Sequence, residues 1–221
     1  KLIEKMGLRP EETAPADAVP DVTVTAERIT EESRAREVLE LFRKADHVTV
    51  LALPDLSGVI VEWEKSEKET LSAEFFFDRY SGDWNALLRA LFSDDIKKVS
   101  HNVKDLQRTL LENDLPIEGF IFDTALAGYL LDATAGKYDI ASLFAAYFHQ
   151  TLAEPKHLDP DAFSMLGDTA EAETAFHVYT SAVDALYEAF APELEKRELH
   201  ELYYKVELPL CAVLARMEHA G

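Results

Sequence analysis

Cysteine is nearly absent from this chain of 221 residues, in which Cys211 stands alone. A single thiol excludes an internal disulfide and a cysteine-rich zinc site, and it is typical of proteins kept in a reducing compartment. Because Cys211 lies in an apolar run, we expect it to be packed rather than reactive. Apolar runs of membrane-spanning length and a secretory signal pattern are also lacking. We therefore expect a cytoplasmic protein without a membrane partner.

Basic residues are scarce, with 22 Lys and Arg against 42 Asp and Glu, so the formal charge is -20. Such a charge repels nucleic-acid phosphates, and we expect weak or no DNA binding by this chain alone. The densest basic cluster consists of Lys97, Lys98, Lys104 and Arg108. A solvated helix end explains this cluster better than phosphate contact, which stays open as the alternative. The 8 glycines form no phosphate-binding loop.

The remaining composition, 48% apolar and 10% aromatic, is that of a folded protein able to bury the core of one domain. Residues 1–8 are amphipathic but too short to fold alone. Residues 9–23 contain three prolines and several acids, a composition typical of a linker. We therefore expect a boundary near residue 20.

Apolar periodicity predicts alternating helices and strands after that boundary. A helix is expected over residues 30–45, starting at Thr30. Three β-rich runs then predict an antiparallel meander with one packed face, namely residues 47–55, 58–64 and 70–77. A short strand at 96–100, a helix at 102–113 and a strand at 119–122 predict a parallel pair with a right-handed crossover.

The rest of the chain is predicted to be mostly helical. The expected helices are 84–92, 124–131 capped by Asp123 or Thr124, 138–148, 171–194 and 198–221. Pro209 marks the beginning of the last helix or a kink in it. Residues 152–169 show little periodicity and are expected to form a loop.

Three segments resemble the 3′-5′ exonuclease-like domain of bacterial DNA polymerase I, family A. They are SHNVKDLQRTLLENDLPIEGF, FDTALAGYLLDATAGKYDIASL and KVELPLCAVLARMEHAG. The resemblance implies an α/β, ribonuclease-H-like (DnaQ-like exonuclease) mixed sheet flanked by helices. It also implies that residues 1–22 are the tail of an upstream 5′ nuclease domain with its linker. Residues 23–203 would be the exonuclease-like domain, and residues 204–221 would begin the connection to a polymerase domain.

Proofreading members of that family hold two divalent metal ions with four carboxylates, because hard cations bind oxygen. The first motif, Asp-x-Glu, should fall in or just after VTVLALPDLSG, where no two acids are spaced by two. Leu51, Ala52 and Leu53 are apolar. Asp55 follows Pro54, and we expect it to form a turn rather than bind metal.

The second and third motifs also depart from the family pattern. In Asn-x-x-x-Asp, Asn102 is present but Leu106 takes the acid's place, and Asp105 comes one residue early, about 100° around a helix. In Tyr-x-x-x-Asp, Tyr179 is followed by Val183 at the acid's place, and Asp184 comes one residue late.

Other candidate ligands are weaker. The seven histidines show no HxH or HxxxH spacing. His101 and Asp105 form an i, i+4 pair that a cap or surface pair explains, and Asp123 is typical of a helix N-cap.

The sequence leaves two functional hypotheses. The first is a catalytically inactive, vestigial exonuclease-like domain that buttresses and spaces a family A DNA polymerase in replication and repair. It needs no cofactor, and its partners are the parent chain's polymerase and 5′ nuclease domains, with DNA bound through the polymerase. The second is an active exonuclease using Mg²⁺ or Mn²⁺ on rearranged carboxylates, namely Asp55, Asp105, Asp123 and Asp184. A binding module without catalysis is a third, weaker interpretation.

Overall fold

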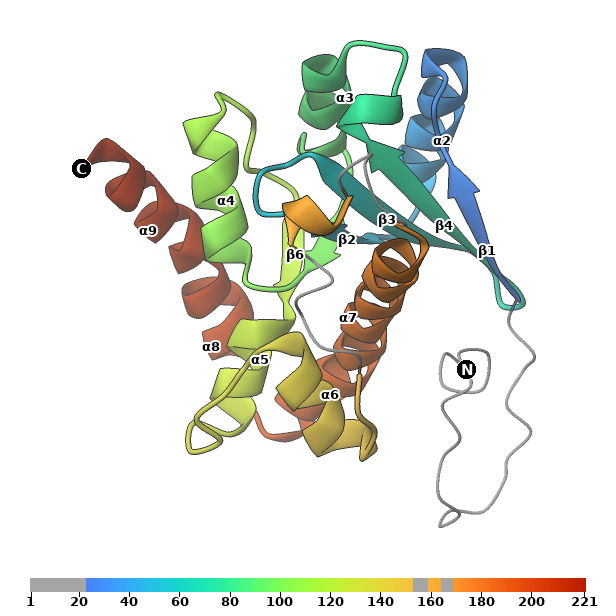
Figure 1. Ribbon diagram of the computed structural model, residues 1–221. Coiled ribbons are helices and arrows are strands. Elements are labelled where there is room, and N and C mark those ends of the chain that lie inside the picture. Colours follow the sequence, from blue (N-terminus) through green and yellow to red (C-terminus); the bar gives the residue numbers. More distant parts are fainter. Residues whose placement is uncertain (1–22, 153–158, 164–168) are drawn as a thin grey trace.

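A computed structural model describes residues 23–152, 159–163 and 169–221 (Figure 1). Its strands are β1 (Thr23–Arg28), β2 (Val48–Ala52), β3 (Gly58–Ser66), β4 (Glu69–Phe76), β5 (Lys98–Ser100) and β6 (Phe120–Asp123). Its longer helices are α2 (Glu32–Lys44), α3 (Trp84–Leu91), α4 (Val103–Glu112), α5 (Thr124–Leu131), α6 (Ile140–Phe148), α7 (Ala170–Lys196) and α9 (Leu208–Ala220). The expectations for residues 1–22 lie outside the described residues.

The six strands form one mixed sheet in the order β1-β4-β3-β2-β5-β6. The predicted antiparallel meander is confirmed as β2, β3 and β4. The predicted crossover is confirmed as well, because β5 and β6 pair in parallel and α4 connects them. Strand β1 was not predicted, and it adds a parallel edge strand beside β4.

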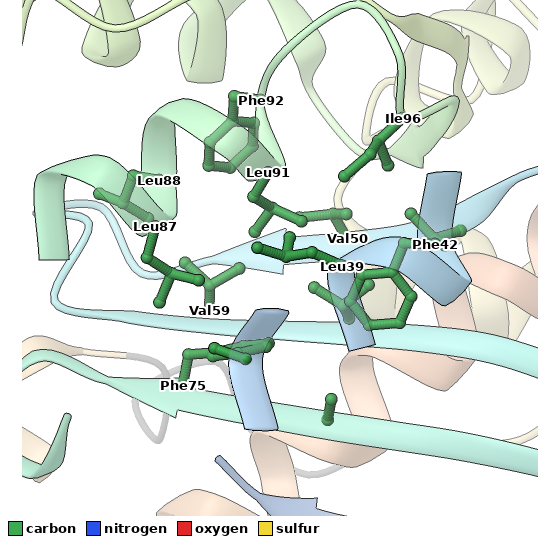
Figure 2. Packing of buried hydrophobic residues seen from close by; sticks show 14 of the residues in the cluster. Leu39, Phe42, Val50, Val59, Phe75, Leu87, Leu88, Leu91, Phe92 and Ile96 are labelled. Atoms are coloured by element: carbon green, nitrogen blue, oxygen red, sulfur yellow. The ribbon is translucent and has the colours of Figure 1, made fainter. Parts of the chain in front are cut away.

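One face of the sheet packs against α2 and α3. Figure 2 shows Val50, Val59 and Phe75, from three neighbouring strands, packed together with Leu39 and Leu91 of these helices. Helix α2 buries the face that its periodicity predicts, but it begins after Glu31, and no side chain caps its first turn. The helix was expected to start at Thr30, which lies one residue before the observed N-cap.

The opposite face packs against α7, with α5 and α6 alongside it (Figure 1). Strand residues alternate between faces, so Thr49 and Leu51 of β2 point toward α7 while Val48 and Val50 point toward α2. In the expected loop, the described residues include a short 3-10 helix, η3 (Pro160–Phe163), whose Phe163 stacks on Phe76.

The C-terminal helix is continuous but irregular. It comprises α8 (His200–Leu202), the π-helical turn η4 (Tyr203–Glu207) and α9. Pro209 has no backbone N–H to donate to the preceding turn, which accounts for the wider turn just before it. No described helix is long and apolar enough to cross a membrane.

Candidate functional site

Some residues from each of the three degenerate motifs lie where α7 crosses the sheet. Asn102 and Tyr179 line one cavity of about 360 Å³, together with His101, Tyr138 and Asp139. Leu51 packs against the apolar cluster that holds Tyr179 and Val183. The fold therefore brings Leu51 of the first motif and Asn102 of the second close to Tyr179 of the third.

At the first motif the strand end is apolar and packed. Leu53 is 1% exposed and lies with Phe176 of α7 in a small core. Asp55 points away into the turn after β2, where it accepts hydrogen bonds from Ser57 N at 2.9 Å and Ser57 Oγ at 2.6 Å. Its predicted turn role is confirmed.

At the second motif the polar residues pair with each other on the surface. Asn102 adopts a left-handed backbone conformation at φ 58°, and its Nδ2 donates to Asp105 Oδ2 at 2.8 Å. Leu106, at the acid's place, packs against the core on the other side of the sheet. The expected pair of His101 with Asp105 does not form. The Nδ1 atom of His101 lies instead 2.7 Å from Thr124 Oγ1.

At the third motif, Val183 is fully buried and Tyr179 is 2% exposed. Asp184 turns toward β2, where Thr49 Oγ1 donates to its Oδ1 at 2.7 Å and His47 Nε2 lies 3.9 Å away. Asp184 is not among the residues that line the cavity beside Tyr179.

Asp123 is buried at 3% exposure and joins two helices. Its carboxylate accepts hydrogen bonds from four backbone N–H groups at 2.8 to 3.4 Å, those of Asn102, Val103, Ala125 and Leu126. Burial raises the pKa of this carboxyl, and the four N–H groups oppose the rise. The predicted N-cap of α5 is confirmed, and the same side chain also holds the first turn of α4, which was not expected from the sequence.

A buried carboxyl group that was not predicted lies beneath α7. Glu62 of β3 is 7% exposed and accepts a hydrogen bond from Ser181 Oγ. Burial, together with the charge of Asp184, raises the pKa of Glu62 to about 8. In the sequence, Glu62 could be recognised only as an acid between apolar residues in the strand segment VIVEWE. Within the described residues, no group of three or more His, Cys, Asp or Glu side chains could hold a metal ion.

A second polar network ties β4 to α7. His177 bridges Ser72 Oγ at 2.7 Å and Glu74 Oε2 at 2.8 Å, and Arg28 Nε donates to Glu74 Oε1 at 2.6 Å. A serine, a histidine and a glutamate in line are the components of a nucleophilic triad. Ser72 is only 1% exposed, however, so no substrate reaches it, and the network is structural.

The basic cluster is dispersed by the fold. Lys98 is 0% exposed and donates to the carbonyls of Ser93 and Ile96 at 2.8 and 2.6 Å. Both predictions for Lys98, a solvated helix end and the alternative phosphate contact, are therefore wrong. Burial lowers the pKa of Lys98 to about 7. Lys104 and Arg108 lie beside Glu218 at 2.6 and 3.7 Å, while Lys97 is exposed.

Comparison with known proteins identifies relatives of this fold. No protein-family model matches the chain. It is 32% identical over 133 residues to DNA polymerase I of Chloroflexus aurantiacus and 29% identical over 199 residues to that of Bacillus caldotenax. These matches cover 56% and 81% of this chain but only 14% and 22% of the relatives.

Two solved structures share the architecture. The POL domain of Pol1 from M. smegmatis, in complex with DNA primer-template and dNTP, matches with a TM-score of 0.69 at 20% identity, over 89% of this chain and 32% of that one. Escherichia coli RNase D, an exoribonuclease, matches with a TM-score of 0.65 at 15% identity, over 86% of this chain and 50% of that one. The predicted ribonuclease-H-like fold is confirmed. The chain is thus homologous to part of bacterial DNA polymerase I and has the fold of its 3′-5′ exonuclease-like domain.

Proposed function

We propose that this chain is a catalytically inactive exonuclease-like domain of a family A DNA polymerase, which buttresses and spaces the polymerase domain in the cytoplasm. One observation carries the proposal. Where proofreading relatives place metal-binding carboxylates, this chain places Leu51, Leu53, Leu106 and Val183, and three of these four side chains pack in or against the cores beneath α7.

The residues present do not fit a pair of Mg²⁺ or Mn²⁺ ions. Such ions bind oxygen ligands at 2.0 to 2.6 Å, whereas Leu51, Leu53 and Val183 offer only methyl groups. The remaining acids are engaged elsewhere: Asp55 in a turn, Asp105 with Asn102, Asp123 with four backbone N–H groups, and Asp184 with Thr49. These side chains therefore support no catalytic step through a metal.

The test is a nuclease assay of the chain on 3′-labelled and 5′-labelled single-stranded DNA with Mg²⁺ or Mn²⁺. We expect no trimming above a blank purified from cells lacking the chain. Metal-dependent 3′ trimming that is abolished by Asp105→Asn or Asp184→Asn would refute the proposal, because a contaminating nuclease would not respond to these substitutions.

The alternative is an active exonuclease built on Asp55, Asp105, Asp123 and Asp184. Crystals soaked in Mn²⁺ separate the two functions. Two anomalous peaks about 4 Å apart between these side chains would favour the enzyme. For the inactive domain we expect no such pair.

The charge of -20 also supports a domain that meets DNA only through its parent polymerase, whose 5′ nuclease and polymerase domains are the proposed partners.

A further inference from the structure

Three aromatic side chains meet on the surface between the end of β4 and the beginning of α3. Phe77 is 61% exposed, and its ring centroid lies 6.0 Å from that of Trp84, edge to face. Trp84 makes a second edge contact with Tyr80 at 6.0 Å, and its Nε1 donates to the carbonyl of Leu56 at 3.2 Å. The rings of Phe77, Trp84 and Tyr80 therefore form one continuous surface, which we call the aromatic shelf.

A groove continues from the shelf between α2 and α3, which cover the same face of the sheet (Figure 1). Tyr80 belongs to both the shelf and this α2–α3 groove, whose volume is about 360 Å³. The apolar residues that line the groove are Ala35, Leu39, Ala86, Leu87 and Ala90. An apolar groove beside an exposed phenylalanine is suited to take up apolar side chains of another molecule.

Negative charge exceeds positive charge around the groove. The charged residues that line it are the acids Glu32, Glu40 and Asp83 and the bases Arg36 and Arg43. Both arginines already have carboxylate partners in the groove, and Arg43 Nε also lies 2.9 Å from Asp95 outside it. The groove therefore favours a cation, as does the whole chain with its charge of -20.

The acids also act on the aromatic shelf. Burial raises the pKa of the Tyr80 phenol, and the charges of Glu32 and Asp83 raise it further against the opposing charge of Arg36. A guanidinium or ammonium group over an aromatic face is attracted by the ring, and carboxylates beside the ring add to that attraction. The same carboxylates repel phosphates, so single-stranded nucleic acid is a poorer occupant of the shelf.

We propose that the aromatic shelf and the α2–α3 groove together form a docking site for a basic amphipathic peptide segment of another protein. Apolar side chains spaced by three or four residues on a helical segment would lie in the groove. A lysine or arginine of the same segment would lie on the shelf beside Asp83. This site goes beyond the proposed function, because it involves neither the degenerate motifs nor the parent polymerase.

The test is a titration of the chain against fluorescein-labelled probes, followed by fluorescence anisotropy at about 150 mM salt to screen general attraction. The main probe is a synthetic helical peptide with leucine on one face and lysine and arginine on the other. A second peptide carries glutamate in place of the basic residues, and a thymidine oligonucleotide represents single-stranded DNA. We expect the basic peptide to bind and the other two probes not to bind.

Two substitutions test the ring and the charge of the shelf. Phe77→Ser removes the exposed ring and should weaken binding by roughly tenfold, as for an aromatic residue that anchors an interface. Asp83→Asn removes the charge, while asparagine can still cap α3, and it should weaken binding by roughly two- to fivefold. Tyr129→Ser and Glu112→Gln make matched changes at positions 49% and 55% exposed on α5 and α4, and should leave binding unchanged.

A third substitution tests the groove separately from the shelf. Ala86→Arg fills the groove at an exposed helical position where arginine is well tolerated, and it should abolish binding. This variant still decides if circular dichroism shows that Phe77→Ser has altered the fold.

Three outcomes would overturn the proposal. The basic peptide could fail to bind the unaltered chain. Binding that none of the three substitutions weakens would mean that the overall negative charge holds the peptide. Binding of the oligonucleotide that is lost in Phe77→Ser would make the shelf a nucleic-acid surface. The nuclease assay on the same samples reports on the proposed function independently of these titrations.

Discussion

The buried carboxyl of Glu62 should make the stability of this domain fall as pH rises. Its pKa is raised from about 4.5 in the unfolded chain to about 8 in the fold, by burial and by the charge of Asp184. Between these values the unfolded chain has released the proton and the folded chain has retained it. The free energy of unfolding must then decrease with pH throughout this window and level off above it.

The magnitude follows from the width of the window. Each pKa unit corresponds to about 1.4 kcal/mol, so a window from 4.5 to 8 amounts to on the order of 5 kcal/mol. The charge of Asp184 causes part of this pKa shift, so the loss of stability arises from Glu62 and Asp184 together. Glu62→Gln keeps the shape of the side chain and an oxygen that can accept from Ser181, and it removes the charge. The variant should match the unaltered protein near pH 4.5 and become progressively more stable than it toward pH 8.

The assay is urea unfolding followed by circular dichroism at a series of pH values. Glu64→Gln, on the same strand but exposed, is the matched control and should leave the pH dependence unchanged. If Glu62→Gln shows the same decline with pH as the unaltered protein, Glu62 does not carry the proton, and burial does not raise its pKa as described.

Three further outcomes are expected. Val183→Asp places a carboxylate at a fully buried position and should lower the free energy of unfolding by about 3 to 5 kcal/mol, measured by thermal melts. The variant should show no nuclease activity in the DNA assay, and a gain of metal-dependent trimming would contradict this expectation. Asp123→Ala leaves backbone N–H groups of two helices without their acceptor and should cost about 3 kcal/mol or more in urea unfolding, whereas Asp105→Ala, at a half-exposed side chain, should cost about 0.5 kcal/mol or less. Cys211 is buried and its pKa is raised to about 11, so thiol reagents near pH 8 should modify it only upon unfolding, and rapid labelling of the folded chain would disprove its packing.

Local patterns were sufficient for much of the fold. Apolar spacing located α2, α3, α4 and α7, because a helix that covers a core must place apolar residues on one side. Alternation located the meander, and the short links around α4 required β5 and β6 to be parallel. The strand β1 escaped detection because its sequence, TVTAER, is short and adjoins a proline-rich segment, and only its pairing with β4 makes it a strand.

The candidate site, like the fold, was only partly predictable from the sequence. Through the resemblance, the sequence predicts that the acids of the three motifs are missing, since Leu106 and Val183 stand where the family pattern has an acid. It could not determine where the remaining acids lie. The contact of Glu62 with Ser181 joins residues 119 positions apart, and that of Thr49 with Asp184 joins residues 135 positions apart.

Burial is the property that only the tertiary structure decided. Lys98 was expected at the surface because lysine is rarely buried. In the fold its ammonium is buried, donates to two carbonyl groups and lies over the ring of Phe120. Val206, Val213 and Met217 of the C-terminal helix are apolar, yet they are exposed, because α9 packs on α4 through another face. The sequence determines the kinds of side chain, and hence the chemistry that they can offer. Which side chains meet, and which stay exposed, depends on elements far apart in the chain and is fixed only when they pack.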